Sequence, residues 1–289
     1  MYADRNIAIL CHTLSGNGKG LAIARETAGI LDKRGINHTL YINEWPEDFL
    51  TFSEIWISGG DGTIHHYINR YNPEQWPVAL IGGGTGNDLK TYLYGKNKTE
   101  DHISMLLDHY EDHQIDLGNC NGILYANSLG IGFDGDVLKN MMSIRKIGGH
   151  LGYLIAVIKT IFTFREKTFV VTFSDKKFKI QPVILAVSNS RLTGGGFIIA
   201  PKASLMDGYL DLMYTDPLPW WKRLWVLPKV EKGSHLLLSC VKHEHVSGVK
   251  IVPAGEVMYQ IDGELMAADS FDIKIHDKKL KLRQFTSSK

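Results

Sequence analysis

The first 115 residues alternate between short apolar runs and segments with helical spacing. Apolar runs at residues 7–10, 54–57 and 77–81 have the length and composition of buried strands. A glycine-rich stretch follows each run, and a segment with apolar residues at helical spacing comes next. This repeated order of strand, glycine loop and helix predicts an α/β domain built on a parallel sheet.

Beyond about residue 115 the pattern changes to short alternating runs separated by turn residues, which predicts an antiparallel sandwich or barrel. Examples are residues 169–173, 183–187, 210–212 and 249–251. Two segments with helical character interrupt the series. They are residues 152–164, which are mostly apolar, and residues 218–230, which contain three tryptophans.

Composition and charge exclude several classes of protein. The chain has 289 residues, 44% of them hydrophobic and 22% charged, as in an ordinary globular protein with one large or two medium domains. The net charge of +1 gives no bulk attraction to a nucleic-acid polymer, and we expect none as a partner. Cys11, Cys120 and Cys240 are far apart, which argues against a disulfide framework or a structural zinc site and suits a reducing cytoplasm.

The N-terminal residues lack the order of a signal peptide, and no segment is apolar enough to span a bilayer. The sequence therefore predicts a cytoplasmic protein, which we expect to lie peripherally at the inner face of the membrane.

The stretch Ser58-Gly59-Gly60-Asp61-Gly62-Thr63 lies between a predicted strand and a predicted helix. Glycines there leave room for backbone N–H groups to approach phosphate oxygens, and the helix N-terminus adds a partial positive charge. The same residues also suit an ordinary tight turn. A second stretch of this kind, at residues 82–88, favours phosphate binding. The loop at residues 15–20 fits neither the Rossmann nor the Walker pattern.

Three short motifs resemble the signatures of the diacylglycerol kinase catalytic-domain family, which includes bacterial lipid kinases and the sphingosine and ceramide kinases. They are Gly59-Gly60-Asp61-Gly62-Thr63, Gly84-Thr85-Gly86-Asn87-Asp88 and Asp262-Gly263-Glu264. Residues 206–212 and 232–235 extend the likeness over nearly the whole chain. One departure is the first loop, where the chain has His12-Thr13-Leu14-Ser15-Gly16 in place of the usual Asn-Pro-x-Ser-Gly.

The resemblance implies an α/β N-terminal nucleotide-binding domain and a C-terminal β-sandwich domain. We place the first at residues 1–118, with the strand at about 276–289 returning to it, and the second at residues 119–275. ATP would lie in the cleft between them with Mg²⁺, and a lipid hydroxyl would be the acceptor.

The resemblance also implies roles for individual residues. Glu264 matches the general base, and Asp61, the other catalytic residue, would orient Mg²⁺ or shape the loop. The nucleotide-binding residues would be Ser15, Gly16, Gly59, Gly60, Asp61, Gly62, Thr63, Thr85 and Asn87. Asp88 and Asp116 would join Asp61 around Mg²⁺, and Ser204, Asp207 and Tyr209 would hold a structural metal.

Each of these roles has a plainer alternative. Glu264 would be a solvated turn residue, Asp88 a helix N-cap, Asp116 the residue that begins a strand, and Asp207 part of a turn. The twelve histidines show no metal pattern, since His65 and His66 are adjacent and His243-x-His245 is a lone pair.

Two other functions share some of these features. NAD kinases and phosphofructokinases have the same Gly-Gly-Asp-Gly-Thr loop, and a non-catalytic lipid- or nucleotide-binding homologue would retain the fold. For a lipid kinase the acceptor stays open among diacylglycerol, sphingoid base, ceramide and phosphatidylglycerol. We also expect transient contact with a membrane surface and a homodimer.

The segment Pro219-Trp220-Trp221-Lys222-Arg223-Leu224-Trp225 is the candidate for that membrane contact. Indole rings favour the headgroup boundary, and Lys222 and Arg223 would attract anionic lipid. The alternative is that the tryptophans belong to the core.

Overall fold

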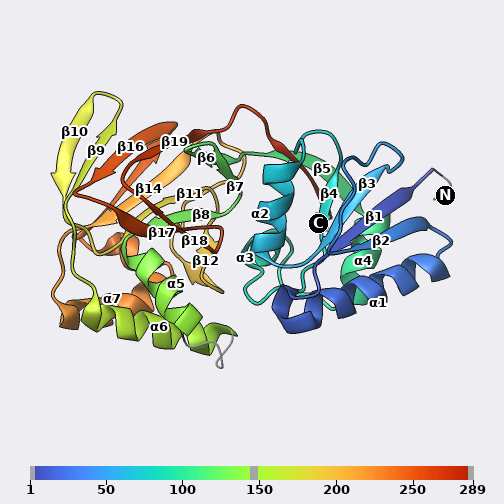
Figure 1. Cartoon of the computed structure of the whole chain (residues 1–289), viewed down its shortest axis with the longest axis horizontal. Coiled ribbons are helices and arrows are strands. Elements are labelled where there is room, and N and C mark those ends of the chain that lie inside the picture. The colour runs from blue at the N-terminus through green and yellow to red at the C-terminus, as the bar shows by residue number, and fades with distance from the viewer. Residues whose placement is uncertain (1–3, 144–148, 286–289) are drawn as a thin grey trace. The chain divides into compact units, whose positions relative to one another are not determined.

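The computed structural model describes residues 4–143 and 149–285, which fall into two compact units (Figure 1). Unit 1 comprises Met1–Ile115 and Lys278–Lys289, and unit 2 comprises Asp116–Asp277. The α/β architecture expected for the N-terminal half and the β-sandwich expected for the C-terminal half are both confirmed.

Unit 1 contains a mixed six-stranded sheet in the order β2-β1-β3-β4-β20-β5. Its elements are β1 (Asn6–Cys11), a short 3-10 helix (Ser15–Gly18), α1 (Lys19–Lys33), β2 (Asn37–Ile42), β3 (Glu54–Ser58), α2 (Asp61–Arg70), β4 (Val78–Leu80), α3 (Asp88–Tyr94), α4 (Thr99–Asp108), β5 (Tyr110–Ile115) and β20 (Leu280–Phe285). The strands from β2 to β20 run parallel, and β5 is antiparallel to β20. β1, β3 and β4 are almost entirely buried, as their continuous apolar sequences predict.

The C-terminal part of the chain forms two strands that lie in different units. β19 (Phe271–Ile275) pairs with β16 and β6 in unit 2, whereas β20 lies in the unit 1 sheet beside β4 and β5. Arg283 of β20 is buried, and its guanidinium pairs with the carboxylates of Glu54 and Asp112. This network fixes the returning strand in unit 1, because separating the buried charges would be costly.

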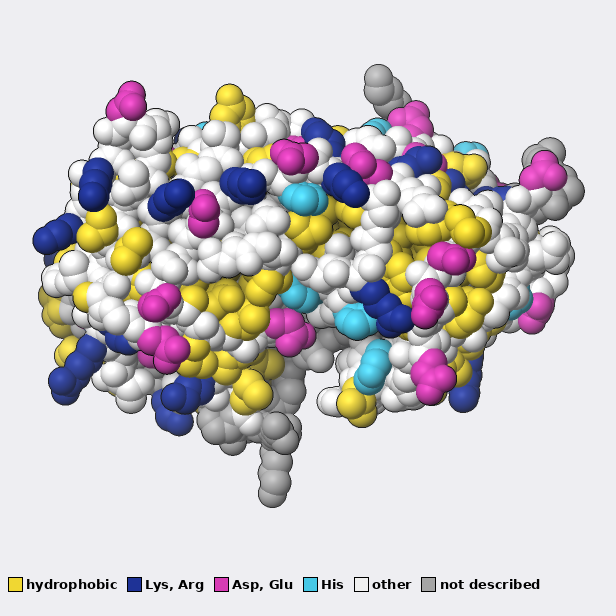
Figure 2. Space-filling model, turned by 45° about the horizontal axis from the view of Figure 1, so that its top comes forward, with side chains coloured by type: hydrophobic (Ala, Val, Ile, Leu, Met, Phe, Trp, Pro, Cys, Tyr) yellow, Lys and Arg dark blue, Asp and Glu magenta, His cyan; other side chains and the backbone are white. Residues whose placement is uncertain are grey.

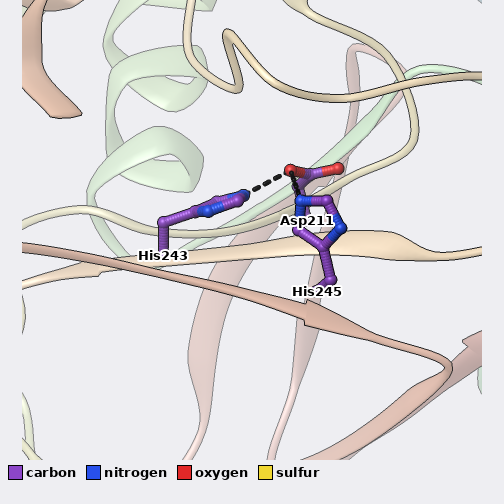
Figure 3. Close-up of side chains that lie close together, drawn as sticks. All are labelled: Asp211, His243 and His245. Carbon is purple, nitrogen blue, oxygen red and sulfur yellow. Dashed lines mark hydrogen bonds and ion pairs between the residues drawn. The ribbon is translucent and has the colours of Figure 1, made fainter.

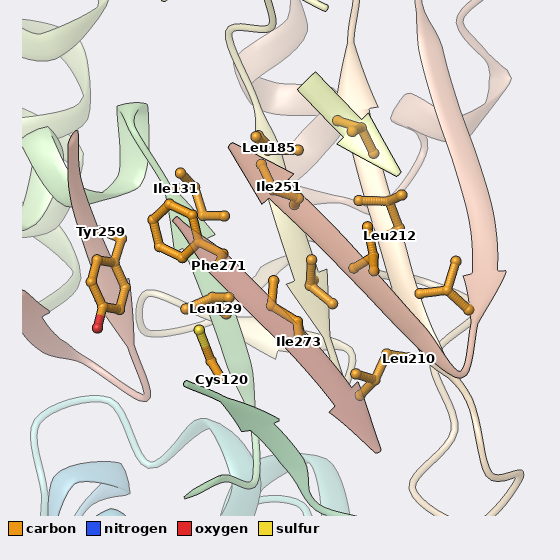
Figure 4. Close-up of a cluster of buried hydrophobic side chains, with 14 of the residues drawn as sticks. Cys120, Leu129, Ile131, Leu185, Leu210, Leu212, Ile251, Tyr259, Phe271 and Ile273 are labelled. Carbon is orange, nitrogen blue, oxygen red and sulfur yellow. The ribbon is translucent and has the colours of Figure 1, made fainter. Parts of the chain in front are cut away.

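Unit 2 is a sandwich of two six-stranded antiparallel sheets, in the orders β10-β9-β16-β19-β6-β7 and β15-β14-β11-β8-β17-β18. The remaining strands are β6 (Gly118–Cys120), β7 (Ile123–Tyr125), β8 (Ser128–Ile131), β9 (Phe169–Phe173), β10 (Lys176–Ile180), β11 (Leu185–Ser188), β12 (Leu192–Thr193), β13 (Phe197–Ile198), β14 (Leu210–Thr215), β15 (Val241–Val246), β16 (Gly248–Pro253), β17 (Val257–Ile261) and β18 (Glu264–Ala268). Side chains such as Leu129 and Leu212 from one sheet and Ile251 and Ile273 from the other form a continuous core (Figure 4).

A second core lies on the other face of the sheet that contains β14. Ala186 and Met213 alternate with the sandwich residues Val187 and Leu212, so they point to this opposite face. They pack there in one cluster with residues of α5 (Phe133–Ser143), α6 (Gly149–Thr163) and α7 (Trp220–Glu231). The two helices predicted inside the C-terminal half therefore cover one face of the sandwich.

Within the described residues, no helix has both the length and the apolar character needed to cross a membrane. On the face drawn in Figure 2, Lys and Arg side chains are interspersed with Asp and Glu. That face therefore carries no extended patch of a single sign.

Candidate functional site

Three glycine loops of unit 1 meet at the carboxyl ends of neighbouring parallel strands. Residues 15–20 follow β1, residues 59–63 follow β3, and residues 82–87 follow β4. β3 pairs with β1 on one side and with β4 on the other. The sequence predicts loops at these places, and the structure brings all three of them together.

Backbone segments of these loops approach so closely that side chains cannot fit between them. A Cβ added to Gly60 would lie 2.8 Å from the Cα of Gly84, and one added to Gly16 would lie 2.2 Å from the carbonyl oxygen of Gly83. A Cβ on Gly83 would lie 2.6 Å from the Cα of Gly20. Gly16 also has a φ of 56°, in the left-handed region that favours glycine.

The loops also lie where the strand order of the sheet reverses. The connection after β1 leads to β2 on one side of the pair, whereas the connection after β3 leads to β4 on the other side. Open α/β sheets bind ligands beyond the carboxyl ends of the strands at such a switch point. The fold therefore places the glycine loops where an α/β protein normally holds its ligand.

Hydroxyl groups hold the three loops together. Ser58 Oγ donates to the carbonyl oxygen of Gly20 at 2.9 Å and lies 3.3 Å from that of Gly82. Ser15 Oγ accepts a hydrogen bond from the Gly60 N–H at 3.3 Å and lies 3.4 Å from Thr63 Oγ1. The changed first-loop motif thus still places Ser15 beside the second loop.

The Asp61 carboxylate has a clear structural partner. Its two oxygens accept hydrogen bonds from the backbone N–H groups of Asp88 and Leu89, at 3.0 and 3.1 Å. A carboxylate in this position satisfies the first N–H groups of α3 and complements its dipole. Asp61 therefore joins the second glycine loop to the helix that follows the third, which is the loop-shaping role left open by the sequence.

Asn87 and Thr85 occupy different environments in the third loop. Asn87 has a φ of 56°, and its side-chain amide bonds both to the N–H of Gly84, at 2.7 Å, and to its carbonyl, at 2.8 Å. Thr85 is exposed on the same loop. Asn87 thus closes the loop, and Thr85 remains accessible to a ligand.

Lys90 is a residue of this region that sequence reasoning missed. Its side chain passes beside Gly82, since a Cβ added there would lie 3.7 Å from the Lys90 Cδ and Cε atoms. Burial lowers the pKa of the Lys90 ammonium, so the charged form gains if an anion binds nearby. The sequence feature that indicates Lys90 is its position as a cation in the first turn of a helix that follows a glycine loop.

The Asp262-Gly263-Glu264 motif forms the turn between β17 and β18 in unit 2. Asp262 is buried with a φ of 47°, and its carboxylate accepts hydrogen bonds from the N–H groups of Ala126, Asn127 and Ser128 at 2.8–3.0 Å. Glu264 follows as the first residue of β18 and is exposed. The turn is therefore fixed by Asp262, while the Glu264 carboxylate is open to solvent.

Asp116 and the predicted structural metal residues lie together in unit 2. The Asp116 carboxylate accepts a hydrogen bond from the Gly208 N–H at 2.8 Å, and its own N–H donates to the Leu205 carbonyl at 2.6 Å. In the same loop, Asp207 Oδ1 accepts from the Tyr209 N–H at 3.0 Å, and Ser204 Oγ lies 3.5 Å from the Met206 nitrogen. Of the three carboxylates predicted around Mg²⁺, Asp61 and Asp88 belong to unit 1 and Asp116 belongs to unit 2.

An apolar pocket lies in unit 2 beneath α6 and α7. Its lining includes Phe133, Asp134, Tyr153, Thr193, Phe197 and Arg223 together with aliphatic side chains of the second core. Burial raises the pKa of Asp134 to about 6, so this carboxyl adds a titratable acid to a wall that is mostly apolar. Such a lining suits an apolar ligand that carries a small polar group.

Two family profiles match the chain. Residues 6–120 match the diacylglycerol kinase catalytic domain, and residues 127–283 match the YegS C-terminal NAD kinase beta sandwich-like domain. A diacylglycerol kinase of Mycobacterium tuberculosis is 24% identical over 284 residues, which cover 90% of this chain and 92% of that protein. A diacylglycerol kinase of Bacillus subtilis is 24% identical over 216 residues, which cover 74% and 71%.

The fold has a similar counterpart among solved structures. A diacylglycerol kinase from Bacillus anthracis superposes with a TM-score of 0.71 at 17% identity, covering 98% of both chains. This likeness shows a shared fold, and the two profiles together extend from residue 6 to residue 283. The chain belongs to the diacylglycerol kinase catalytic-domain family of lipid kinases, in the form whose C-terminal half is the YegS β-sandwich-like domain.

Proposed function

We propose that this protein transfers the γ-phosphate of ATP to the hydroxyl group of a lipid, either diacylglycerol or a related one. The observation that carries the proposal is the meeting of three glycine loops at the switch point of the unit 1 sheet. Because glycine lets these backbones pack directly against one another, the N–H groups of three loops gather at one edge of the sheet and could donate to phosphate oxygens. Mg²⁺, when bound with the nucleotide, would neutralise part of the phosphate charge.

The proton acceptor in this proposal is Glu264. A lipid hydroxyl is a weak acid, so a carboxylate that takes its proton as the new bond forms lowers the barrier. The exposure of Glu264 leaves it accessible to an acceptor, and the bonds of Asp262 hold the turn before it. The fixed turn supports a catalytic role over that of an unconstrained turn residue.

The apolar pocket of unit 2 supports a lipid as the acceptor. Its walls are formed mostly by aliphatic and aromatic side chains of α6, α7 and the adjacent sheet. An acyl chain would bury its surface there, at about 25 cal/mol for each Å² removed from water. A nucleotide such as NAD would find few polar partners along the same walls.

Contact with a membrane surface is the third part of the proposal. On α7, Trp220, Trp221 and Trp225 are each more than half exposed, which argues against the core alternative. On α6, Ile158 and Phe162 are both exposed and lie one turn apart. The ring centroids of Phe162 and Trp220 are 5.4 Å apart. The two helices therefore present one exposed aromatic surface, defined here by Ile158, Phe162, Trp220, Trp221 and Trp225.

Lysines flank this aromatic surface. Lys222 Nζ lies 5.3 Å from the ring centroid of Trp221, and Lys229 Nζ lies 4.5 Å from that of Trp225. The prediction that Arg223 faces lipid is wrong. Arg223 is buried, where it donates to the carbonyls of Leu218, Ile161 and Phe164 and pairs with Glu166 at 2.6 Å. Indoles with neighbouring lysines match the headgroup region of an anionic leaflet.

The test is incubation with labelled ATP and a panel of diacylglycerol, sphingoid base, ceramide and phosphatidylglycerol, with NAD included as a competing acceptor. We expect a labelled phospholipid that Glu264→Gln does not produce. Label found only on NAD would favour the NAD kinase-like alternative. ATP binding without any labelled product would favour a non-catalytic homologue.

A further inference from the structure

Two histidines and one aspartate gather on one face of the edge strand pair β14–β15. Asp211 of β14 is directly opposite His245 of β15, and His243 is opposite Met213. Residues two apart on a strand point to the same face, so His243, His245 and Asp211 share one side of the sheet. Figure 3 shows both imidazole rings directed at the Asp211 carboxylate.

The three side chains are close enough to bind one ion. One candidate ligand atom from each lies within 4.8 Å of the other two. His243 Nε2 contacts Asp211 Oδ1, and His245 Nε2 lies 3.5 Å from the same oxygen. The set therefore offers two imidazole nitrogens and one carboxylate around a common point.

The Asp211 carboxylate is almost fully buried, at 1% exposure, and only one of its oxygens is used in these contacts. Its Oδ2 atom has no hydrogen-bond partner among the residues that the structure describes. On the neighbouring strand Ser188 is in register with Asp211, and its buried hydroxyl likewise lacks a partner in the described part of the chain. Unsatisfied buried oxygens are costly, which points to a ligand.

The cluster is also open to solvent at one side. His245 is 41% exposed and His243 is 13% exposed, so an ion could reach the carboxylate from water. β15 is the edge strand of its sheet, and β14 is its neighbour there.

We propose that Asp211, His243 and His245 bind a divalent transition-metal ion, with Zn²⁺ as the ion to test. Imidazole nitrogen together with carboxylate oxygen is a donor set that suits Zn²⁺ and related ions. Mg²⁺ prefers oxygen ligands and demands octahedral geometry, so this position is chemically distinct from a phosphate-linked Mg²⁺. Three protein ligands leave a fourth position for water.

A bound ion would join β15 to β14 through side chains in addition to the backbone ladder. It would also give the buried Asp211 carboxylate a cationic partner. Because the three ligands come together only in the folded sheet, binding should stabilise unit 2 by an amount that grows with the logarithm of the free metal concentration above the Kd.

Calorimetric titration of the EDTA-treated full chain with Zn²⁺, and absorption spectroscopy with Co²⁺, would test this site. We expect one ion per chain, and we expect His243→Ala and His245→Ala each to weaken binding by at least about tenfold, since loss of even an outer partner costs 10–100-fold. Asp211→Asn keeps the shape of the buried side chain and should have the same effect. His109→Ala removes an exposed histidine of unit 1 and serves as the matched control.

Circular dichroism of each variant separates lost ligands from lost folding, and His245→Ala, as the most exposed of the three, is the variant expected to stay folded. No Zn²⁺ binding by the wild type would overturn the proposal. Wild-type affinity and stoichiometry in a folded His245→Ala variant would also overturn it, and would leave the cluster as a contact between histidine and aspartate side chains.

Discussion

Glu264 is the residue on which the proposed transfer step depends. Glu264→Gln keeps the size of the side chain and removes the proton acceptor, so turnover should fall by ~10²–10⁴-fold. The nucleotide would be bound by other residues, and its affinity should stay nearly unchanged. Steady-state kinetics on the best lipid and calorimetry with ATP measure the two quantities.

The matched control is Glu256→Gln, which changes an exposed carboxylate elsewhere in unit 2. Its turnover should equal that of the wild type. Full turnover in Glu264→Gln would show that another group accepts the proton.

Gly60 tests whether the glycine loops hold phosphate. Gly60→Val places a branched side chain where the Cβ alone would lie 2.8 Å from the Gly84 Cα, so ATP affinity should fall at least about tenfold. Gly29→Val is the control, because a Cβ at Gly29 in α1 meets no atom within 4 Å. If a Gly60→Val protein with a native circular dichroism spectrum bound ATP as well as the wild type, the loop would be a simple turn.

The sequence indicates which residues form the candidate site better than it indicates how they act. The glycine motifs mark the loops because their spacing is local. The bond of the Asp61 carboxylate to α3 links residues 27 and 28 positions apart, and that of Asp262 spans more than 130 positions. No local pattern records such contacts, so the bonds that give Asp61 its loop-shaping role, and those that fix Asp262, appear only in the fold.

At the scale of elements, β1, β3 and β4 follow directly from their apolar runs, whereas the polar strand β5 has no such run. The C-terminal tail is harder to assign, because Phe271–Ile275 and Leu280–Phe285 both have strand character. Which sheet each strand joins depends on distant partners such as Glu54 for Arg283. Arg223 shows the same limit, since its charge suggests a surface position and two of its three carbonyl partners lie about 60 residues away.

The packing of α4 on β4 predicts a specific pH dependence. His102 of α4 is buried, its Nε2 lies 2.8 Å from the Leu80 carbonyl oxygen, and burial lowers its pKa from 6.5 to about 4. The unfolded chain therefore binds the proton more readily. The contribution of neutral His102 to the free energy of unfolding is therefore complete above pH 6.5 and is lost as the pH falls towards 4.

Between pH 7 and pH 5 this residue should account for a loss of about 2 kcal/mol in the free energy of unfolding. His102→Gln keeps a donor for the carbonyl and does not titrate, so its stability should change less over that range. Urea denaturation of both proteins at the two pH values measures the difference. Equal losses in both would place the pH dependence on other groups.

For the whole molecule, the exposed aromatic surface predicts how the protein reaches an insoluble substrate. Replacing both Trp221 and Trp225 by alanine removes two indoles that would enter the headgroup region, so binding to anionic vesicles should weaken at least about tenfold. Activity on vesicles should fall with it, and activity on a short-chain soluble acceptor should persist. Co-sedimentation and parallel assays on the two substrates measure these effects.

Val252→Ala is the control for this experiment. Val252 is also apolar and is 49% exposed. It lies on β16, in the sheet that does not contain β14 and is not covered by α6 and α7. Its vesicle binding should match that of the wild type. Equal losses of the tryptophan variant on both substrates would show that the indoles support the fold.

The return of β20 to unit 1 has a consequence for synthesis on the ribosome. Unit 2 is one continuous segment, whereas the unit 1 sheet needs a strand that is made only after all of unit 2. Until β20 emerges, β4 and β5 lack the neighbour that separates them, and Glu54 lacks Arg283. The sheet of unit 1 can therefore be completed only after the whole of unit 2 has been made.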